Sequence, residues 1–277
     1  ISDIIKMISK LIERGNAYVL DGHVYFSVPS FPDYEKLAGK DMDKMIAGSR
    51  VEISENKRNP ADFVLWKPAG EDDDISSIFD SPWGKGRPGW HIECSAMSTK
   101  YLGKTFDIHG GGIDLIFPHH TNEIAQSCCC YPESKYARYW IHNGFLKVDG
   151  QKMSKSLGNF ITLDELFEKN IAGETIRFVY LTTHYSKPLN WTQNSVIEAK
   201  KSLDSFYRIL EQYPDISLLQ RDEINKVILD ALYNDLNTPK AISLLHELAK
   251  RYNKATTEKD KLVIASQLYM SGKLLGL

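Results

Sequence analysis

The alternation of helix-like and strand-like segments between residues 90 and 148 constrains the fold of this chain most strongly. The segments predict a helix over 90–102 that Gly103 ends, a strand over 106–109, a helix from Pro118 to about Cys130, and strands over 139–142 and 145–148. Such alternation is typical of α/β architecture with a parallel sheet. Ligands of these sheets bind beyond the carboxyl ends of strands, where the turns His109–Gly112 and His142–Gly144 are predicted to lie.

The first 80 residues predict a small mixed unit. Apolar residues at helical spacing indicate a helix over 3–14, with Ser2 as its N-cap and Gly15 as its stop. Two short apolar runs around Asp21-Gly22 indicate a hairpin. We expect a polar, partly helical stretch as far as about Ser49, and then a buried strand over 63–66.

The chain after Asn159 is predicted to be helical. The expected helices cover 172–183, 192–212, 219–236, 238–254 and 258–275. Pro239 stands at a helix start, which is a position that proline tolerates. The last three helices are expected to form a bundle with an interior of leucine, isoleucine and alanine.

Composition excludes several classes of protein. The chain has 277 residues, of which 42% are hydrophobic and 25% charged, as is usual for a soluble globular protein. Its net charge of −2 gives RNA binding no general support, so any RNA contact must depend on local patches. No signal peptide is expected, and no apolar run approaches the about 20 residues of a membrane helix. Cys94 and the run 128–130 do not suggest a disulfide framework, which favours a reducing cytoplasm.

Cys94, His119 and Glu123 form the first candidate site. His119 and Glu123 are four residues apart, so one face of a helix carries both. A thiolate, an imidazole and a carboxylate are all zinc ligands, and three of them leave one coordination position open. The alternative is structural: Cys94 as a small buried hydrophobe, His119 as a helix cap and Glu123 paired with a surface lysine. His120 is another possible ligand, although it points about 100° round a helix from His119.

Gly110–Gly112 and Asp114 form the second candidate site. Glycines allow a backbone to approach a ligand closely, and a carboxylate two residues later can accept hydrogen bonds from ribose hydroxyls. The alternative is a tight turn with a solvated aspartate.

The stretch Lys152–Asn159 is the third candidate site. It lies between the turn residues Asp149-Gly150 and a capping box at Thr162–Glu165, so we expect Lys152 and Lys155 on a loop. Lysines on a mobile loop can stabilise the charge that develops on phosphates, although a lysine pair is usually solvated surface. The octapeptide resembles the KMSKS signature of class I aminoacyl-tRNA synthetases.

Several longer stretches, in order, resemble the cysteinyl-tRNA synthetase family: residues 57–67, 86–97, 106–115, 117–127 and 232–239. The resemblance implies a Rossmann-like nucleotide-binding fold, present as its second half, with an inserted small α+β module and a C-terminal helical bundle. It divides the chain into an insertion module (1–80), the second half of the catalytic domain (81–150), the KMSKS loop with linking helices (151–190) and a tRNA stem-contacting bundle (191–277).

The resemblance also implies a function. Family members activate L-cysteine with ATP and Mg²⁺ to cysteinyl-adenylate and transfer it to the 3′ end of tRNA(Cys). They hold one Zn²⁺ through Cys, Cys, His and Glu, and Cys94, His119 and Glu123 match the last three. Zinc prefers sulfur to oxygen, so a Zn–S bond separates cysteine from serine without a separate editing site. A cytoplasmic monomer is expected.

The remaining roles follow from the same resemblance. Trp90 is expected to stack against the amino acid. His109, Gly111, Asp114 and Asn143 are expected to contact ATP or line its site, and Asp114 to lie near the ribose. Lys155 is expected to bind phosphate directly, with Lys152 in support.

The chain also departs from the family pattern. The first zinc ligand, the HIGH motif and the anticodon-binding unit are expected to lie outside these residues, so that residues 1–277 alone would not activate cysteine. Thr121 stands where the family usually has Glu. Two other functions remain open: the cysteine ligase of mycothiol synthesis, which uses an amino-sugar acceptor, and a non-catalytic zinc- or tRNA-binding module.

Overall fold

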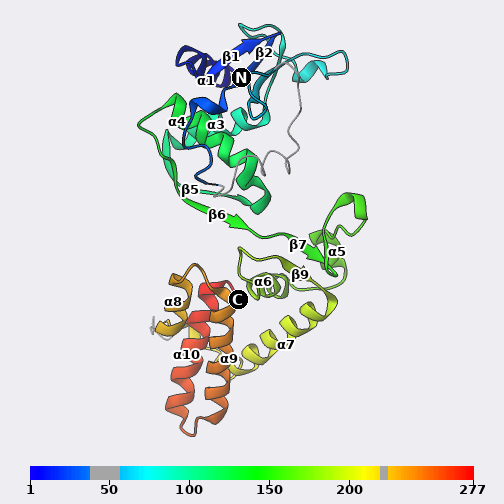
Figure 1. Cartoon of the computed structure of the whole chain (residues 1–277). Helices are drawn as coiled ribbons and strands as arrows, with labels where there is room; N and C mark the ends of the chain where they lie inside the picture. Colours follow the sequence, from blue (N-terminus) through cyan, green and yellow to red (C-terminus); the bar gives the residue numbers. More distant parts are fainter. Residues whose placement is uncertain (38–56, 219–223) are drawn as a thin grey trace. The chain divides into compact units, whose positions relative to one another are not determined.

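The computed structural model describes residues 1–37, 57–218 and 224–277. They form two compact units, Ile1–His142 and Asn143–Leu277, and each unit is described by itself (Figure 1).

An antiparallel four-stranded sheet organises the first unit. Its strands run in the order β1 (Ala17–Leu20), β2 (His23–Phe26), β3 (Phe63–Pro68) and β4 (Gly86–Pro88). The predicted hairpin is confirmed. Asp21 and Gly22 form its turn with φ angles of 48° and 75°, the left-handed conformation that two-residue hairpin turns require.

Helix α1 (Ser2–Glu13) covers the core of this unit. It buries Ile4, Met7, Ile8 and Leu11, which recur every three or four residues on one face. The helix is confirmed, but Ile1 rather than Ser2 is its N-cap, and Gly15 follows the C-cap Arg14. The predicted helical stretch to Ser49 falls mainly on residues 38–56, which lie outside the described residues.

Helices α3 (Trp90–Leu102) and α4 (Thr121–Cys130) alternate with strands β5 (Thr105–Gly112) and β6 (Tyr136–Asn143), which pair with each other. The end of α3 at Gly103 is confirmed, with a φ of 91°. The two predicted turns are wrong. Gly110–Gly112 and His142-Asn143 continue the strands, because the backbone pairing extends farther than the apolar pattern that defined them.

The start of α4 is also corrected. We predicted a helix from Pro118, but the regular helix begins at Thr121, after the irregular segment Ile116–His120. Phe117 has extended φ and ψ of −135° and 133°. Proline disfavours helical geometry in the residue before it, so the chain cannot enter a regular helix there.

A three-stranded sheet opens the second unit, in the order β8 (Gln151–Lys152), β7 (Leu146–Val148) and β9 (Leu189–Trp191). Strand β7 is parallel to β9 and antiparallel to β8. Lys152 therefore lies in a strand rather than on a loop, opposite Lys147. The capping box of α5 (Leu163–Glu168) is confirmed, with Thr162 and Glu165 bonding each other's backbone N–H.

Helices complete this unit: α6 (Gly173–Leu181), α7 (Gln193–Leu210), α8 (Lys226–Tyr233), α9 (Thr238–Lys254) and α10 (Glu258–Leu275). Both α9 and α10 are confirmed. Helix α8 confirms part of the predicted helix over 219–236, of which residues 219–223 lie outside the described residues. It starts after the N-cap Asn225, and Asp235 and Leu236 beyond its end have positive φ angles of 55° and 52°. Single-turn helices lie at Val28–Ser30, Ile75–Ser77, Ile113–Leu115, Lys155–Leu157 and Ile216–Leu218.

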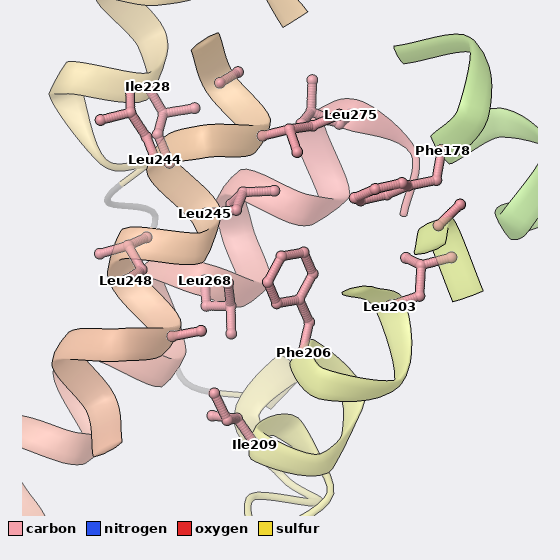
Figure 2. Packing of buried hydrophobic residues seen from close by; sticks show 14 of the residues in the cluster. Phe178, Leu203, Phe206, Ile209, Ile228, Leu244, Leu245, Leu248, Leu268 and Leu275 are labelled. Atoms are coloured by element: carbon pink, nitrogen blue, oxygen red, sulfur yellow. The ribbon is translucent and has the colours of Figure 1, made fainter. Parts of the chain in front are cut away.

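One apolar core joins these helices. Figure 2 shows Phe178, Phe206, Leu245 and Leu268 pointing toward one another from α6, α7, α9 and α10. The predicted leucine, isoleucine and alanine interior is confirmed, and two phenylalanines add to it. None of the helices in the described ranges combines the length and apolar character that crossing a bilayer requires.

The core predicts a clear contrast between two leucines. Leu245 has no exposed surface, whereas Leu274 on α10 is 45% exposed. We expect Leu245→Ala to lower the free energy of unfolding by about 2–5 kcal/mol, because a buried cavity replaces the side chain. Leu274→Ala should change it by less than about 0.5 kcal/mol. Urea denaturation of both variants measures this, and equal losses would contradict the packing in Figure 2.

Candidate metal centre and lysine loop

A buried carboxylate occupies the middle of the first unit's site. Glu123, in the first turn of α4, has no exposed surface. Within the described residues, neither of its oxygens accepts a hydrogen bond by geometry. The side chains nearest to it include three histidines and a cysteine rather than a lysine or arginine. The predicted alternative, a pair with a surface lysine, is therefore wrong.

The structure brings Cys94, His119 and Glu123 together. One ligand atom of each lies within 4.8 Å of the others. His119 Nε2 is 3.6 Å from Glu123 Oε1. Ligand atoms on one tetrahedral zinc ion are about 3.4 Å apart, so small shifts of these side chains would suffice for coordination. Cys94 comes from α3, one turn after Trp90, whereas His119 lies in the irregular segment Ile116–His120 and Glu123 in α4.

His91 fixes the orientation of His119. The two Nδ1 atoms are 2.7 Å apart, so one ring donates and the other accepts. If His119 Nε2 is free to bind a cation, its Nδ1–H is the donor and His91 accepts. A second hydrogen bond on the far nitrogen is the usual support of a metal-binding histidine.

A second group lies at the other carboxylate oxygen. His109 Nε2 and His120 Nε2 are 3.1 and 4.0 Å from Glu123 Oε2. His120 Nδ1 is 2.8 Å from His142 Nε2, which repeats the support that His91 gives His119. His119 and His120 therefore both face Glu123, each at a different oxygen.

Burial opposes protonation of His91, His119 and His120. It lowers the pKa of His91 to about 4 and that of His120 to about 3, in both cases with help from neighbouring histidines. It also lowers the pKa of His119, against the attraction of Glu123. Burial, together with the Glu123 and Glu93 charges, raises the pKa of the Cys94 thiol to about 11. A neutral imidazole is a ready metal ligand, whereas Cys94 needs a cation to become a thiolate at neutral pH.

These residues fit a divalent cation. A buried carboxylate without hydrogen bonds is strongly destabilising unless a positive charge compensates it. Burial opposes protonation of His91, His119 and His120, so these three rings do not supply that charge. Sulfur, nitrogen and oxygen donors around an open position are the ligand set of zinc.

Trp90 lies directly over this group. Its ring is 60% exposed, and its centroid is 4.3 Å from that of His119 and 5.7 Å from that of His91. An exposed aromatic face beside a metal position can cover a small bound molecule.

Gly111 and Gly112 of strand β5 have close neighbours that leave no room for a Cβ atom, which the sequence did not reveal. A Cβ atom on Gly111 would lie 2.7 Å from His120 Cε1 and 3.1 Å from Leu115 Cδ1. A Cβ on Gly112 would lie 2.5 Å from Asp114 Oδ1. Asp114 itself is exposed. Gly111 therefore leaves room for an imidazole ring, while the role of Asp114 toward a ribose stays a prediction.

The lysine loop belongs to the second unit. Lys152 and Lys155 are exposed, and Lys152 Nζ lies 3.8 Å from the centroid of the Phe145 ring. Asn159 closes the loop: its side chain accepts from Ser154 N at 2.9 Å and donates to Lys152 O at 3.3 Å. The loop is thus tied at its base, while Lys155 stays free in solvent for an anionic partner.

A cavity of about 480 Å³ lies beside β7 in the same unit. Its lining includes Asn143, Phe145, Tyr180 and His184. Gly144 is needed there, because a Cβ atom would lie 2.3 Å from the carbonyl carbon of Lys187.

The sequence interpretation missed His91 and His142. One signal was available: five of the eight histidines, His91, His109, His119, His120 and His142, fall between residues 91 and 142. Their density suggests a common site, but their spacing does not show which rings meet.

Comparison with known proteins agrees with this fold. Residues 1–201 match the model of the tRNA synthetases class I (C) catalytic domain, and residues 228–277 match the DALR domain. The chain belongs to the family of class I (C) tRNA synthetase catalytic domains.

Curated relatives are cysteine–tRNA ligases. That of Wolbachia pipientis subsp. Culex pipiens (strain wPip) is 52% identical over 279 residues, with 100% of this chain and 60% of the relative covered. That of Rickettsia bellii (strain OSU 85-389) is 51% identical, with 99% and 59% covered. The chain thus spans about 60% of the length of the curated relatives it matches.

Two solved structures show the fold alone. Mycobacterium tuberculosis methionyl-tRNA synthetase in complex with methionyl-adenylate is 12% identical with a TM-score of 0.59, over 99% of this chain and 70% of the other. A putative arginyl-tRNA synthetase from Campylobacter jejuni is 15% identical with a TM-score of 0.55, over 100% and 61%. The predicted α/β class, the second half of a nucleotide-binding fold with a helical C-terminal region, is confirmed.

The close approach at Gly111 gives a prediction. Gly111→Ala should lower the free energy of unfolding by about 1–3 kcal/mol, because the added methyl forces the His120 ring to move. Gly173→Ala is the matched control: nothing lies within 4 Å of its Cβ position, and alanine suits a helix. Chemical denaturation measures both, and an unchanged Gly111→Ala variant would contradict the packing.

Proposed function

We propose that this chain forms part of a cysteine–tRNA ligase that activates L-cysteine with ATP and Mg²⁺ and transfers it to the 3′ end of tRNA(Cys). Membership of the family and the names of its relatives support the class of enzyme. The four-segment division at residues 80, 150 and 190, a cytoplasmic location and a monomeric state are part of the same proposal.

The convergence of Cys94, His119 and Glu123 carries the proposal. Cys94 comes from α3, His119 from the irregular segment Ile116–His120 and Glu123 from α4, yet their ligand atoms lie within 4.8 Å. In the proposed enzyme they hold one Zn²⁺, which supplies a soft Lewis-acid centre able to bind a thiolate and to distinguish it from a hydroxyl. His91 positions His119 through the contact between their Nδ1 atoms. Trp90 covers the amino acid with its exposed ring.

The proposed ATP-binding residues belong to both units. In the first unit, His109, Gly111 and Asp114 serve the nucleotide. In the second, Asn143 serves the adenine, which agrees with its place on a cavity wall. Lys155 binds phosphate as a point charge at the tip of its tied loop, while Lys152 supports it from strand β8.

Cys94→Ser tests the metal proposal. In the intact protein, we expect bound zinc to fall and cysteine-dependent ATP–pyrophosphate exchange to drop at least about 100-fold, because a hydroxyl is a much poorer zinc ligand than a thiolate. Cys128→Ser is the matched control. Cys128 is partly buried, and its sulfur lies 3.5 Å from Ser134 O, a contact that a hydroxyl can replace. Zinc is measured by metal analysis, independently of activity.

The outcomes separate the alternatives. Equal zinc in both variants would contradict the metal role of Cys94. Zinc binding without exchange would favour a non-catalytic module. Exchange followed by transfer of cysteine to an amino sugar, without charging of tRNA, would favour the mycothiol ligase.

The lysine loop gives a separate prediction. Lys155→Ala should slow pyrophosphate exchange by about 10²–10³-fold, because one charge that stabilises the transition state is lost. Lys152→Ala should have a smaller effect. Lys169→Ala, an exposed lysine of the same unit, should have none. Single-turnover kinetics measure the three variants, and an effect of Lys169→Ala as large as that of Lys155→Ala would show that only general charge matters.

A further inference from the structure

Glu123 presents its two oxygens to two different sets of side chains. Oε1 lies 3.6 Å from His119 Nε2 on the proposed zinc side. Oε2 lies 3.1 Å from His109 Nε2 and 4.0 Å from His120 Nε2. One donor atom each of His109, His120 and Glu123 also lies within 4.8 Å of the other two.

We propose that His109, His120 and Glu123 form a second divalent-cation site, which shares the Glu123 carboxylate with the site of Cys94 and His119. The proposal of a second site rests on the proposed function only through the shared Glu123 carboxylate. The carboxylate can bridge two cations, one on each oxygen.

The rings of this second site are held in place. His120 Nδ1 is 2.8 Å from His142 Nε2, so its Nε2 stays directed at Glu123. His109 packs edge-on against His120 at 89°, with centroids 4.6 Å apart, and lies 4.9 Å from Trp140. The missing side chain of Gly111 leaves the space that the His120 ring fills. Donor rings fixed before binding lose little entropy when a cation arrives.

The donor set defines the class of cation. Two imidazole nitrogens and a carboxylate oxygen, without sulfur, suit Zn²⁺, Co²⁺, Ni²⁺ or Cu²⁺ and give soft cations no preference. Three ligands leave a position open, and the His109 side chain keeps 17% of its surface exposed, so water can reach the cation. Neither oxygen of Glu123 accepts a hydrogen bond within the described residues. If a cation bound only at Oε1, Oε2 would still lack a hydrogen-bond donor or a cation.

The shared carboxylate makes the two sites antagonistic. A cation on Oε1 withdraws charge from Oε2 and also repels a second cation nearby. Because coupling between sites is reciprocal, loss of the first site must strengthen the second. Tighter cation binding at the second site after loss of the first therefore distinguishes a bridged pair of sites from two independent sites.

Cobalt titration of the metal-free, intact protein tests the inference. Co²⁺ bound through Cys94 has a thiolate-to-metal charge-transfer band in the near ultraviolet, whereas Co²⁺ bound by nitrogen and oxygen has only visible bands. We expect the wild type to bind one Co²⁺ with the charge-transfer band and then a weaker one without it. Cys94→Ser should bind one Co²⁺ without that band, more tightly than the second ion of the wild type.

His109→Gln removes a ligand of the second site alone. We expect it to weaken the second cobalt step at least about tenfold while the charge-transfer band persists, which also shows that the unit is folded. His246→Gln, a half-buried histidine of the second unit, is the control and should change neither step.

Two results would overturn the inference. One is a wild type that saturates at one Co²⁺. The other is a second step that is as strong in His109→Gln and His120→Gln variants as in the wild type, which would indicate an adventitious ion only. Zinc-edge anomalous diffraction provides a second measurement, with one peak expected at each oxygen of Glu123. A missing charge-transfer band in the wild type would refute the proposed Cys94 site instead, so the two failures are distinguishable.

Discussion

The burial of the Glu123 carboxylate is the constraint on which the first unit's site depends. A carboxylate removed from water needs a positive charge or several hydrogen bonds, because the desolvation penalty is several kcal/mol. Glu123 has no exposed surface, and within the described residues its neighbours are histidines and a cysteine rather than lysine or arginine. A bound cation meets this constraint directly, and neutral donors on both sides of the carboxylate are what a cation requires.

The same constraint explains why α4 is polar where most buried helices are apolar. Thr121 donates to Ile116 O at 2.8 Å, and Gln126 accepts from Ser95 at 2.6 Å. The first bond secures the start of α4, and the second joins α4 to Ser95 of α3. Three histidines then lie within 4.0 Å of the carboxylate, and His91 and His142 hydrogen-bond to two of them. Polar contacts, rather than apolar packing, thus hold the histidine side chains beside Glu123 in place.

Sequence patterns predicted the parts of this fold that local physics determines. The hairpin at Asp21-Gly22, the end of α3 at Gly103 and the capping box at Thr162 follow from turn and cap chemistry within a few residues. The glycines of β5 were misread because their reason is nonlocal: Gly111 faces the ring of His120, nine residues later. The contacts of His91 with His119 and of His142 with His120 were missed for the same reason, since residue spacing does not show which rings meet across elements.

The two units carry groups with opposite physical requirements. Binding of a metal by side chains is strengthened by rigid, buried donors whose orientation other residues hold. Stabilisation of phosphate charge by lysines needs exposed groups that can move toward a transition state. Glu123 has no exposed surface, whereas Lys155 lies on an exposed loop whose base is held by Asn159. Because the two belong to separate compact units, a substitution that loosens the loop need not disturb the donors around Glu123. In the proposed enzyme, the donor cluster around Glu123 and the lysine loop are therefore expected to respond to mutation independently.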